Sequence, residues 1–187
     1  MKITVLCCGN SLGVPVIGCE CAICTSENSK NKRLRVSVLI EINGMNIVVD
    51  TSPDFRQQML LTNIKKIGAV LYTHDHADHV HGIDDLRQFN VLQGGVIPVY
   101  SNEEILSSIQ QRFAYAFLPK PVENAMFRPS LAPNILPDIS NYEFMIGNVK
   151  IVAFEQRHGK SVTLGYRIGD FAYSTDVNML PESAFEA

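Results

Sequence analysis

The sequence has no apolar stretch that approaches the roughly 20 residues needed to cross a membrane. Its first apolar run, residues 3–8 after Lys2, is too short for a signal-peptide core of roughly 7–15 residues, and Asn10 and Ser11 follow it closely. We therefore interpret residues 3–8 as a buried first strand and expect a cytoplasmic protein. A chain of 187 residues predicts one domain, residues 1–187, which can bury roughly 70% of its unfolded surface.

An excess of basic residues is also missing. Sixteen Lys and Arg stand against 19 Asp and Glu, which gives a formal net charge of −3. Lys30, Lys32, Arg33 and Arg35 form the only basic cluster, which is either a solvated loop or a landing point for phosphate. This balance argues against broad nucleic-acid binding, which requires a more basic surface. The sequence also lacks repeats and low-complexity segments, so nothing indicates a repeat protein.

Cysteine is sparse, and its number, five, is odd. Without a signal peptide the cysteines are expected to be reduced thiols or metal ligands. Cys19, Cys21 and Cys24 are close enough in sequence to bind one soft metal, and tetrahedral zinc fits three thiolates. The alternative is three free loop thiols. Cys7 and Cys8 are expected to be core and edge residues of the first strand.

Strand and helix signals alternate along the chain. Strands are expected over residues 3–8, 36–42, 45–49, 69–73, 96–100, 142–146, 149–154, 163–168 and 171–174, and helices over 54–62, 83–91 and 103–113. Residues 9–33 should form a long loop, and the proline-rich residues 120–137 should form a loop or lid rather than a helix or central strand. This order predicts an α/β (α+β) fold with two mixed sheets and helices outside.

The most informative segment is residues 74–79, His-Asp-His-Ala-Asp-His, which follows a short apolar run. His74 and His76 are two residues apart just beyond a strand end, so both can bind one ion. Asp78 and His79 lie further round the turn and are expected to bind a second ion. Paired metals ~3.5–4 Å apart clamp the attacking and leaving oxygens of a hydrolytic displacement. The alternative is a polar loop that happens to be rich in histidine.

Two residues from the C-terminal part could complete these sites. His158 follows a predicted strand and by itself could equally be a surface residue or lie behind the ligands. Beside a site that lacks one imidazole it is expected as the third imidazole on the first metal, because catalytic zinc needs three protein ligands and an open position. Asp176 could bridge the two ions, although a turn or N-cap role is the alternative. His81 is expected behind the ligands rather than among them. Asp75 is expected to point elsewhere, where it could orient an imidazole.

Several stretches of the chain are similar to the metallo-β-lactamase fold superfamily, and within it to the PhnP-like phosphoribosyl cyclic phosphodiesterase branch. The similar stretches are residues 13–24, residues 50–56 (Asp-Thr-Ser-Pro-Asp-Phe-Arg), residues 74–87, His158 and residues 173–176 (Tyr-Ser-Thr-Asp). The resemblance implies a four-layer αββα sandwich with the site at one edge between the two sheets.

The resemblance also implies the cofactors. It implies two divalent metals, manganese or zinc, one at His74, His76 and His158 and the other at Asp78 and His79, with Asp176 between them. It further implies a structural zinc at Cys19, Cys21 and Cys24 whose fourth ligand is a histidine near the C-terminus.

This chain stops short of the family pattern, which usually continues for some tens of residues. We therefore expect the last strand and helix elements, the last ligand of the second metal and the fourth zinc ligand to be missing from it. The domain would then be truncated at its C-terminus, and exposed apolar surface would favour a homodimer. Waters or a partner chain could complete the metal spheres.

The expected function is hydrolysis of a small cyclic phosphodiester, of the phosphoribosyl cyclic phosphate or cyclic nucleotide type. Asp78, Asp176 and His76 are the expected catalytic residues, and no membrane or nucleic-acid partner is expected. One alternative is a ribonuclease Z-like nuclease that processes tRNA 3′ ends, which shares the fold and the histidine pattern. An alternative of another class is a catalytically silent metal-binding fragment. Thioester or lactam hydrolysis also stays open, because the fold alone does not determine the substrate.

Overall fold

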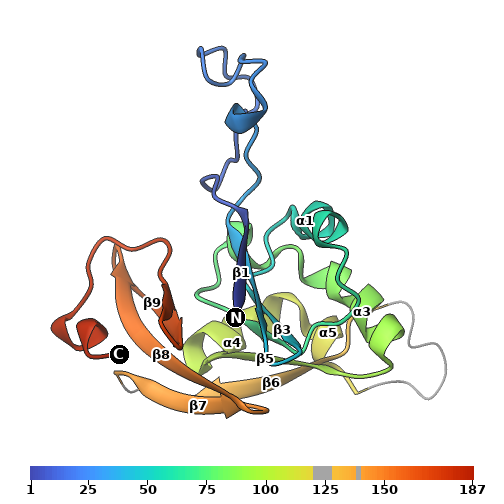
Figure 1. Ribbon diagram of the computed structural model, residues 1–187, viewed down its shortest axis with the longest axis vertical. Helices are drawn as coiled ribbons and strands as arrows, with labels where there is room; N and C mark the ends of the chain where they lie inside the picture. The colour runs from blue at the N-terminus through green and yellow to red at the C-terminus, as the bar shows by residue number, and fades with distance from the viewer. Residues whose placement is uncertain (120–127, 138–139) are drawn as a thin grey trace.

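The computed structural model describes residues 1–119, 128–137 and 140–187 (Figure 1). The strands are β1 (Lys2–Cys7), β2 (Ser37–Ile42), β3 (Met45–Val49), β4 (Ala69–Leu71), β5 (Ile97–Asn102), β6 (Leu131–Leu136), β7 (Tyr142–Ile146), β8 (Val149–His158), β9 (Ser161–Ile168) and β10 (Phe171–Tyr173). The helices are α1 (Phe55–Thr62), α2 (Ala77–Val80), α3 (Leu86–Gln93), α4 (Glu103–Arg112) and α5 (Ala114–Phe117), with 3₁₀ turns η1 (Ser29–Asn31), η2 (Ile83–Asp85) and η4 (Glu182–Phe185).

The first sheet has six strands in the order β1-β2-β3-β4-β5-β6. Its first three strands are antiparallel, and β3 to β6 are parallel. Asn43 and Gly44 form the hairpin turn between β2 and β3, and both have positive φ, 51° and 75°. The parallel connections contain the helices, as such crossovers require. The carboxyl ends of β3, β4 and β5 therefore meet at one edge of this sheet.

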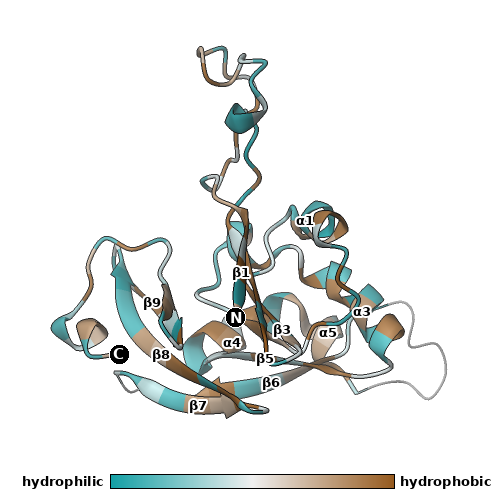
Figure 2. Cartoon of the chain, viewed as in Figure 1, coloured by the Kyte–Doolittle hydropathy of each residue, from teal (hydrophilic) through white to brown (hydrophobic). Residues whose placement is uncertain are grey.

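The second sheet is an antiparallel meander in the order β10-β9-β8-β7. It packs against the first sheet through one hydrophobic cluster that contains residues of both. The Tyr166 hydroxyl of β9 donates a 2.7 Å hydrogen bond to the Tyr72 carbonyl just after β4, and the Tyr100 and Phe144 rings stack 5.5 Å apart. Figure 2 shows hydrophobic residues along the central strands and on the inner side of α4, where Ile105, Leu106 and Ile109 are buried.

Two strand predictions need correction. The first strand was expected to be buried, but β1 is the edge of its sheet, and the side chain of Val5 is 61% exposed. Residues 120–137 were expected to be a loop, yet β6 lies within them. Strand β6 is the other edge of the sheet, where Pro133 is tolerated because its missing N–H faces no partner strand. Residues 120–127 of that segment lie outside the described residues.

The helix predictions hold in outline. Helices α1 and α4 match residues 54–62 and 103–113, and the Asn102 side chain caps α4 by accepting a 3.0 Å hydrogen bond from the Ile105 N–H. The helix expected over residues 83–91 is divided into η2 and α3, and α5 was not predicted. Within the described parts of the chain, none of the helices has the length and apolar character to span a membrane.

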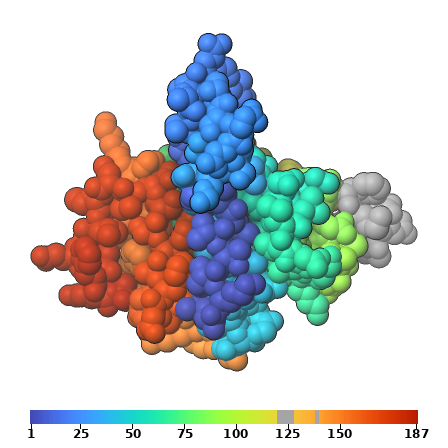
Figure 3. Space-filling model, turned by 45° about the horizontal axis from the view of Figure 1, so that its top comes forward, coloured from blue at the N-terminus to red at the C-terminus, as the bar shows by residue number. Residues whose placement is uncertain are grey.

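A narrow projection, residues 10–32, leaves the body between β1 and β2, and we call it the arm. Figures 1 and 3 show it in blue, standing clear of the rest of the molecule. Bridges between Gly9 and Arg35 and between Val14 and Arg33 close its base. The arm is mostly irregular, as predicted for residues 9–33, and its Ile17 side chain is fully exposed.

Candidate metal centre

The histidine-rich segment begins where the buried strand β4 ends. His76 is the N-cap residue of the short helix α2, and the His79 N–H donates a 3.0 Å hydrogen bond to the His76 carbonyl. This tight turn places Asp78 and His79 on the helix and leaves His74 and His76 in the extended chain before it. The segment therefore presents its side chains as two pairs, as the sequence predicted.

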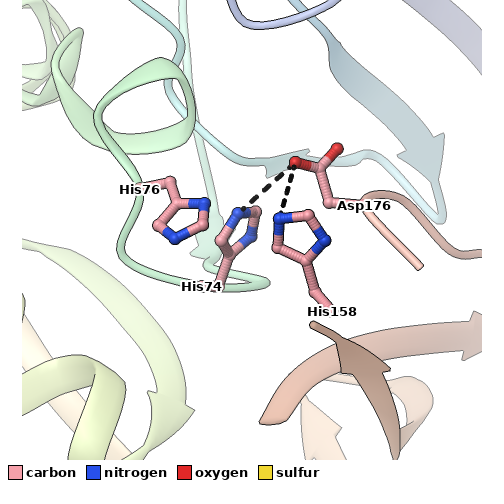
Figure 4. A group of neighbouring side chains, drawn as sticks. All are labelled: His74, His76, His158 and Asp176. Carbon is pink, nitrogen blue, oxygen red and sulfur yellow. Dashed lines mark ion pairs between the residues drawn. The ribbon is translucent and has the colours of Figure 1, made fainter. Parts of the chain in front are cut away.

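The structure brings four predicted ligands together in a first group: His74, His76, His158 and Asp176. Their potential ligand atoms all lie within 4.8 Å of one another. His158 is the last residue of β8, and Asp176 follows β10, so three separate parts of the chain meet here (Figure 4). The Asp176 Oδ2 atom lies 3.7 Å from His74 Nε2 and 3.8 Å from His158 Nε2.

Asp78, His79 and Asp176 form a second group whose ligand atoms also lie within 4.8 Å of one another. His79 Nε2 is 3.4 Å from Asp78 Oδ2 and 3.5 Å from Asp176 Oδ2. Asp176 thus belongs to both groups, which is the position that a bridging carboxylate would take. Its backbone has a φ of 47°, a left-handed conformation that is uncommon for residues other than glycine.

Asp50 lies behind His79, a position that no pattern in the sequence predicted. Its Oδ2 atom accepts a 2.7 Å hydrogen bond from His79 Nδ1, and its two oxygens also accept from the Thr73 N–H and hydroxyl. Asp50 follows β3 and Thr73 follows β4; because these strands are parallel neighbours, their carboxyl ends meet. The one signal in the sequence that could have indicated a role for Asp50 is its place directly after a buried strand, at the start of residues 50–56.

This arrangement determines which ring nitrogens of two histidines carry protons. The Thr73 hydroxyl donates to Asp50, so its oxygen accepts the 2.9 Å hydrogen bond from His74 Nδ1. The Nδ1 atoms of His74 and His79 are therefore both occupied by buried oxygen partners. Their Nε2 atoms face the two ligand groups, which is how such supporting contacts orient metal-binding imidazoles.

These Nε2 atoms provide a test of whether a metal fits. Both are buried and have no hydrogen-bond partner among the described residues. A buried polar atom without a partner is costly, roughly 1–3 kcal/mol. A divalent cation between each Nε2 atom and the neighbouring carboxylate would satisfy it, and histidine nitrogen with carboxylate oxygen suits zinc or manganese. The donor set therefore fits two divalent metals.

The charge states of these residues differ strongly. Burial, together with the nearby His79, lowers the pKa of His74 to about 4, so His74 is neutral at pH 7. Burial opposes the charged form of His79, but the carboxylates of Asp50, Asp176 and Asp78 outweigh it and raise its pKa to about 12. The His79 imidazole in turn lowers the pKa of Asp176 to about 2 and also lowers that of Asp78. In the metal-free protein a proton on His79 thus occupies the place of a cation.

Two neighbours of the ligands take other positions. Asp75 points away from both ligand groups, as expected; its partners are not an imidazole but the Ser108 hydroxyl, which donates to its carboxylate at 2.5 Å, and Arg112, with which it pairs. It therefore attaches the histidine segment to α4. His81 belongs to neither ligand group, as predicted, and its ring packs edge-on against Phe113 at 5.6 Å.

The cysteine trio lies in the arm, and its three sulfur atoms are within 4.8 Å of one another. The Val16 N–H donates a 3.4 Å hydrogen bond to Cys24 Sγ, and Cys24 is buried whereas Cys21 is exposed. Hydrogen bonds from the Cys24 backbone and the Cys19 thiol lower the pKa of Cys21 to about 7. Cys7 is half-buried on the edge strand β1, and Cys8 is exposed.

A cavity of about 510 Å³ lies elsewhere, between α1 and α3. It is lined by apolar residues such as Phe55 and Phe89 and by Arg56, Lys65 and Arg87. None of the proposed ligands lines it, so its size says nothing about the metal centre.

The model of the β-lactamase superfamily domain matches residues 45–187. The chain therefore belongs to this superfamily, and its two sheets with helices form the metallo-β-lactamase fold of metal-dependent hydrolases, as the sequence predicted. Within the superfamily it falls in the PhnP-like branch. A crystal structure of a new diphosphatase from the PhnP family matches it with a TM-score of 0.84 and 35% sequence identity. The match covers 98% of this chain and 68% of the diphosphatase chain.

Other relatives extend the comparison. The octanoyltransferase of Porphyromonas gingivalis is 36% identical over all 187 residues, but the chain spans only 37% of that protein's length. The Zn²⁺-bound PqqB structure from Methylobacterium extorquens is 20% identical, with a TM-score of 0.72, covering 98% of this chain and 68% of that one. The structure of human tRNase Z, short form, is 14% identical in sequence, with a TM-score of 0.67. The match covers 98% of this chain and 72% of the tRNase Z chain. These last two likenesses show a shared fold alone.

Proposed function

We propose that this chain is a metal-dependent phosphodiesterase that hydrolyses a small cyclic phosphodiester. The observation that carries the proposal is the pair of ligand groups that share Asp176. Two cations held in this way suit an in-line displacement at phosphorus, in which the attacking and leaving oxygens each need charge stabilisation. The similarity to a diphosphatase of the PhnP family supports phosphoryl chemistry.

His74, His76, His158 and Asp176 would hold one ion, and Asp78, His79 and Asp176 would hold the other. Mn²⁺ or Zn²⁺ bound there would polarise phosphoryl oxygens and make a nucleophile available at neutral pH. The carboxylates of Asp78 and Asp176 are ionised, so each can accept a hydrogen bond from the attacking water and orient it. Asp50 and Thr73 keep the imidazoles of His79 and His74 in place.

Access to this centre comes from one side. His74 and His79 are buried, whereas His76 is exposed and His158 and Asp176 are partly exposed. A small substrate would therefore approach along His76, His158 and Asp176. We propose in addition that Cys19, Cys21 and Cys24 hold a structural zinc in the arm, because three thiolates at this distance suit that metal.

The direct test is turnover of bis(p-nitrophenyl) phosphate with added Mn²⁺. We expect metal-dependent hydrolysis that is lost in His76→Ala and kept in His81→Ala, a neighbouring histidine outside both ligand groups. Absence of metal-dependent turnover in the wild-type chain, with two ions bound, contradicts the proposal. Binding of one ion or none at the histidines favours the silent metal-binding domain instead.

A substrate panel separates the chemical classes. The panel contains a cyclic nucleotide, which tests the proposed activity. It also contains a nucleoside diphosphate and an S-octanoyl thioester, which correspond to the diphosphatase and octanoyltransferase relatives. We expect the cyclic phosphodiester to be preferred. Pre-tRNA should give no gel shift, because the net charge is −3 and Arg35 of the one basic cluster is paired with Asp54. Preference for the thioester or binding of pre-tRNA contradicts the assignment.

A further inference from the structure

The loop that carries Asp176 is supported unevenly. On its C-terminal side, the backbone is bonded to β8: the Arg157 N–H donates to the Met179 carbonyl at 2.9 Å, and the Asn178 N–H donates to the Arg157 carbonyl at 2.8 Å. On its N-terminal side, β10 ends at Tyr173, and Asp176 itself has a left-handed backbone. Something other than strand pairing must hold the loop between these two points.

Gln156 of β8 makes that connection. Its side chain is fully buried. Its Nε2 atom donates a 2.5 Å hydrogen bond to the Thr175 carbonyl, and its Oε1 atom accepts a 2.5 Å hydrogen bond from the Ser174 hydroxyl. The two residues before Asp176 are thus both attached to one amide group. Asp176 makes one side-chain hydrogen bond within the described residues, a 3.3 Å contact from the Thr175 hydroxyl.

The same strand also supplies a ligand. Gln156 and His158 are two residues apart on β8, so their side chains lie on the same face of the sheet. The amide therefore connects the loop of Asp176 to the strand that carries His158, while His74 and His79, which face Asp176 from the other side, follow β4 of the first sheet. The Nε2 atoms of these three histidines lie 3.8, 3.7 and 3.5 Å from Asp176 Oδ2.

We infer that Gln156 is a positioning residue that sets where the shared carboxylate lies between the two ligand groups. The inference rests on the proposed metal centre. The second group has only two ligands besides Asp176, namely Asp78 and His79, whereas the first group has three imidazoles besides Asp176. The second group therefore depends more on this carboxylate. Loss of the Gln156 amide should therefore lower the affinity for the second ion more than the affinity for the first, although no ligand is removed.

The test compares two buried glutamines. Gln58 of α1 is also fully buried and holds its surroundings in the same way, accepting from the Ser52 hydroxyl and donating to the Arg35 carbonyl. Gln156→Met and Gln58→Met each remove two such hydrogen bonds with little change of volume. Both variants should lose similar thermal stability, so stability alone does not distinguish them.

Titration with Mn²⁺, followed by electron paramagnetic resonance, distinguishes them. Mn²⁺ is used because thiolates bind it poorly, so the cysteine trio does not contribute. We expect the weaker Mn²⁺ to bind about 10–100-fold less tightly in Gln156→Met, in the range seen for residues that support ligands. The magnetic coupling between the two Mn²⁺ ions should be lost as well. Gln58→Met should keep wild-type affinity and coupling.

Equal Mn²⁺ binding in Gln156→Met and wild type overturns the positioning role. Wild-type protein that binds fewer than two Mn²⁺ at the histidines overturns the metal centre itself, and the positioning role with it. If Gln156→Met does not fold, Ser174→Ala removes one of the two attachments and should show a smaller loss in the same direction. Unchanged affinity in Ser174→Ala then counts against the inference.

Discussion

The two candidate metal sites are built in opposite ways. The histidine centre combines residues from separate parts of the chain and is supported from behind by buried groups such as Asp50 and Thr73. The cysteine trio spans six residues of the exposed arm, and among the described residues one backbone group, the Val16 N–H, donates to a sulfur of the trio. One site is therefore preorganised by the folded body, and the other depends on the ion it binds. Metal at the trio should order the arm, and metal at the centre should add charge to a structure that is already formed.

The largest effect should come from Asp176→Ala, because this residue belongs to both ligand groups. We expect the hydrolysis rate to fall by more than about 100-fold, beyond the loss typical for a supporting residue. Steady-state kinetics with Mn²⁺, together with metal analysis of the purified protein, measures both consequences. Asp170→Ala, in the turn before β10, is a control that should keep wild-type rate and metal content. Two tightly bound ions in Asp176→Ala would contradict a bridging role.

Asp50→Asn should come next. It keeps the size of the side chain but removes the charge that holds His79, so Mn²⁺ affinity should fall about 10–100-fold. Calorimetric titration measures the change. Asp54→Asn is the matched control. Asp54 also accepts a hydrogen bond from a backbone N–H and pairs with a charged residue, but its partner is Arg35 and it belongs to neither ligand group. An equal loss in both variants would show that Asp50 does not act through the centre.

Metal binding should release about one proton at pH 7.5, because Mn²⁺ must displace the proton held by His79, whose pKa is about 12. His74, with a pKa of about 4, is already neutral and should release none. Calorimetry in buffers of different ionisation enthalpy counts the protons, and His79→Gln should abolish the release. Binding enthalpies that do not depend on the buffer would exclude a protonated His79.

The same pKa values predict how pH acts on the metal-free fold. His74 binds a proton less readily in the folded state than in the unfolded state, so its contribution to stability is lost as pH falls from 6.5 towards 4. His79 has the opposite sign: its contribution is complete below pH 6.5 and is lost as pH rises towards 12. Urea unfolding of the metal-free protein between pH 4 and pH 9 should therefore show a maximum near pH 6.5. A flat profile in this range contradicts both assignments.

The smallest effect on catalysis should come from Cys21→Ser. This change should lower the zinc content by one ion and make the arm more sensitive to limited proteolysis, because local order depends on local contacts. The Mn²⁺-dependent rate should stay at the wild-type level, as in the control Cys8→Ser. Loss of hydrolysis in Cys21→Ser alone would show that the arm and the centre are coupled, and would remove the contrast between the two sites.

Most of the candidate ligands could be predicted because their spacing is local. The histidine segment and the cysteine trio each lie within six residues, so the chain cannot separate them far, and the structure brings both sets together. His158 and Asp176 were placed by residue type and by resemblance. Asp50 and Gln156 received no role, because their importance arises from contacts with residues 29 and 19 positions away.

The sequence by itself determined the ligand types, the strands on either side of the Asn43-Gly44 turn and the positions of α1 and α4, since these depend on side-chain chemistry and local backbone preference. The tertiary structure alone decided that β1 is an exposed edge, that the arm stands away from the body, and that Asp50 lies behind His79. The physical reason is that burial and charge proximity depend on which strands become neighbours. The order of strands sets the pKa values of His74 and His79, and no local pattern contains that order.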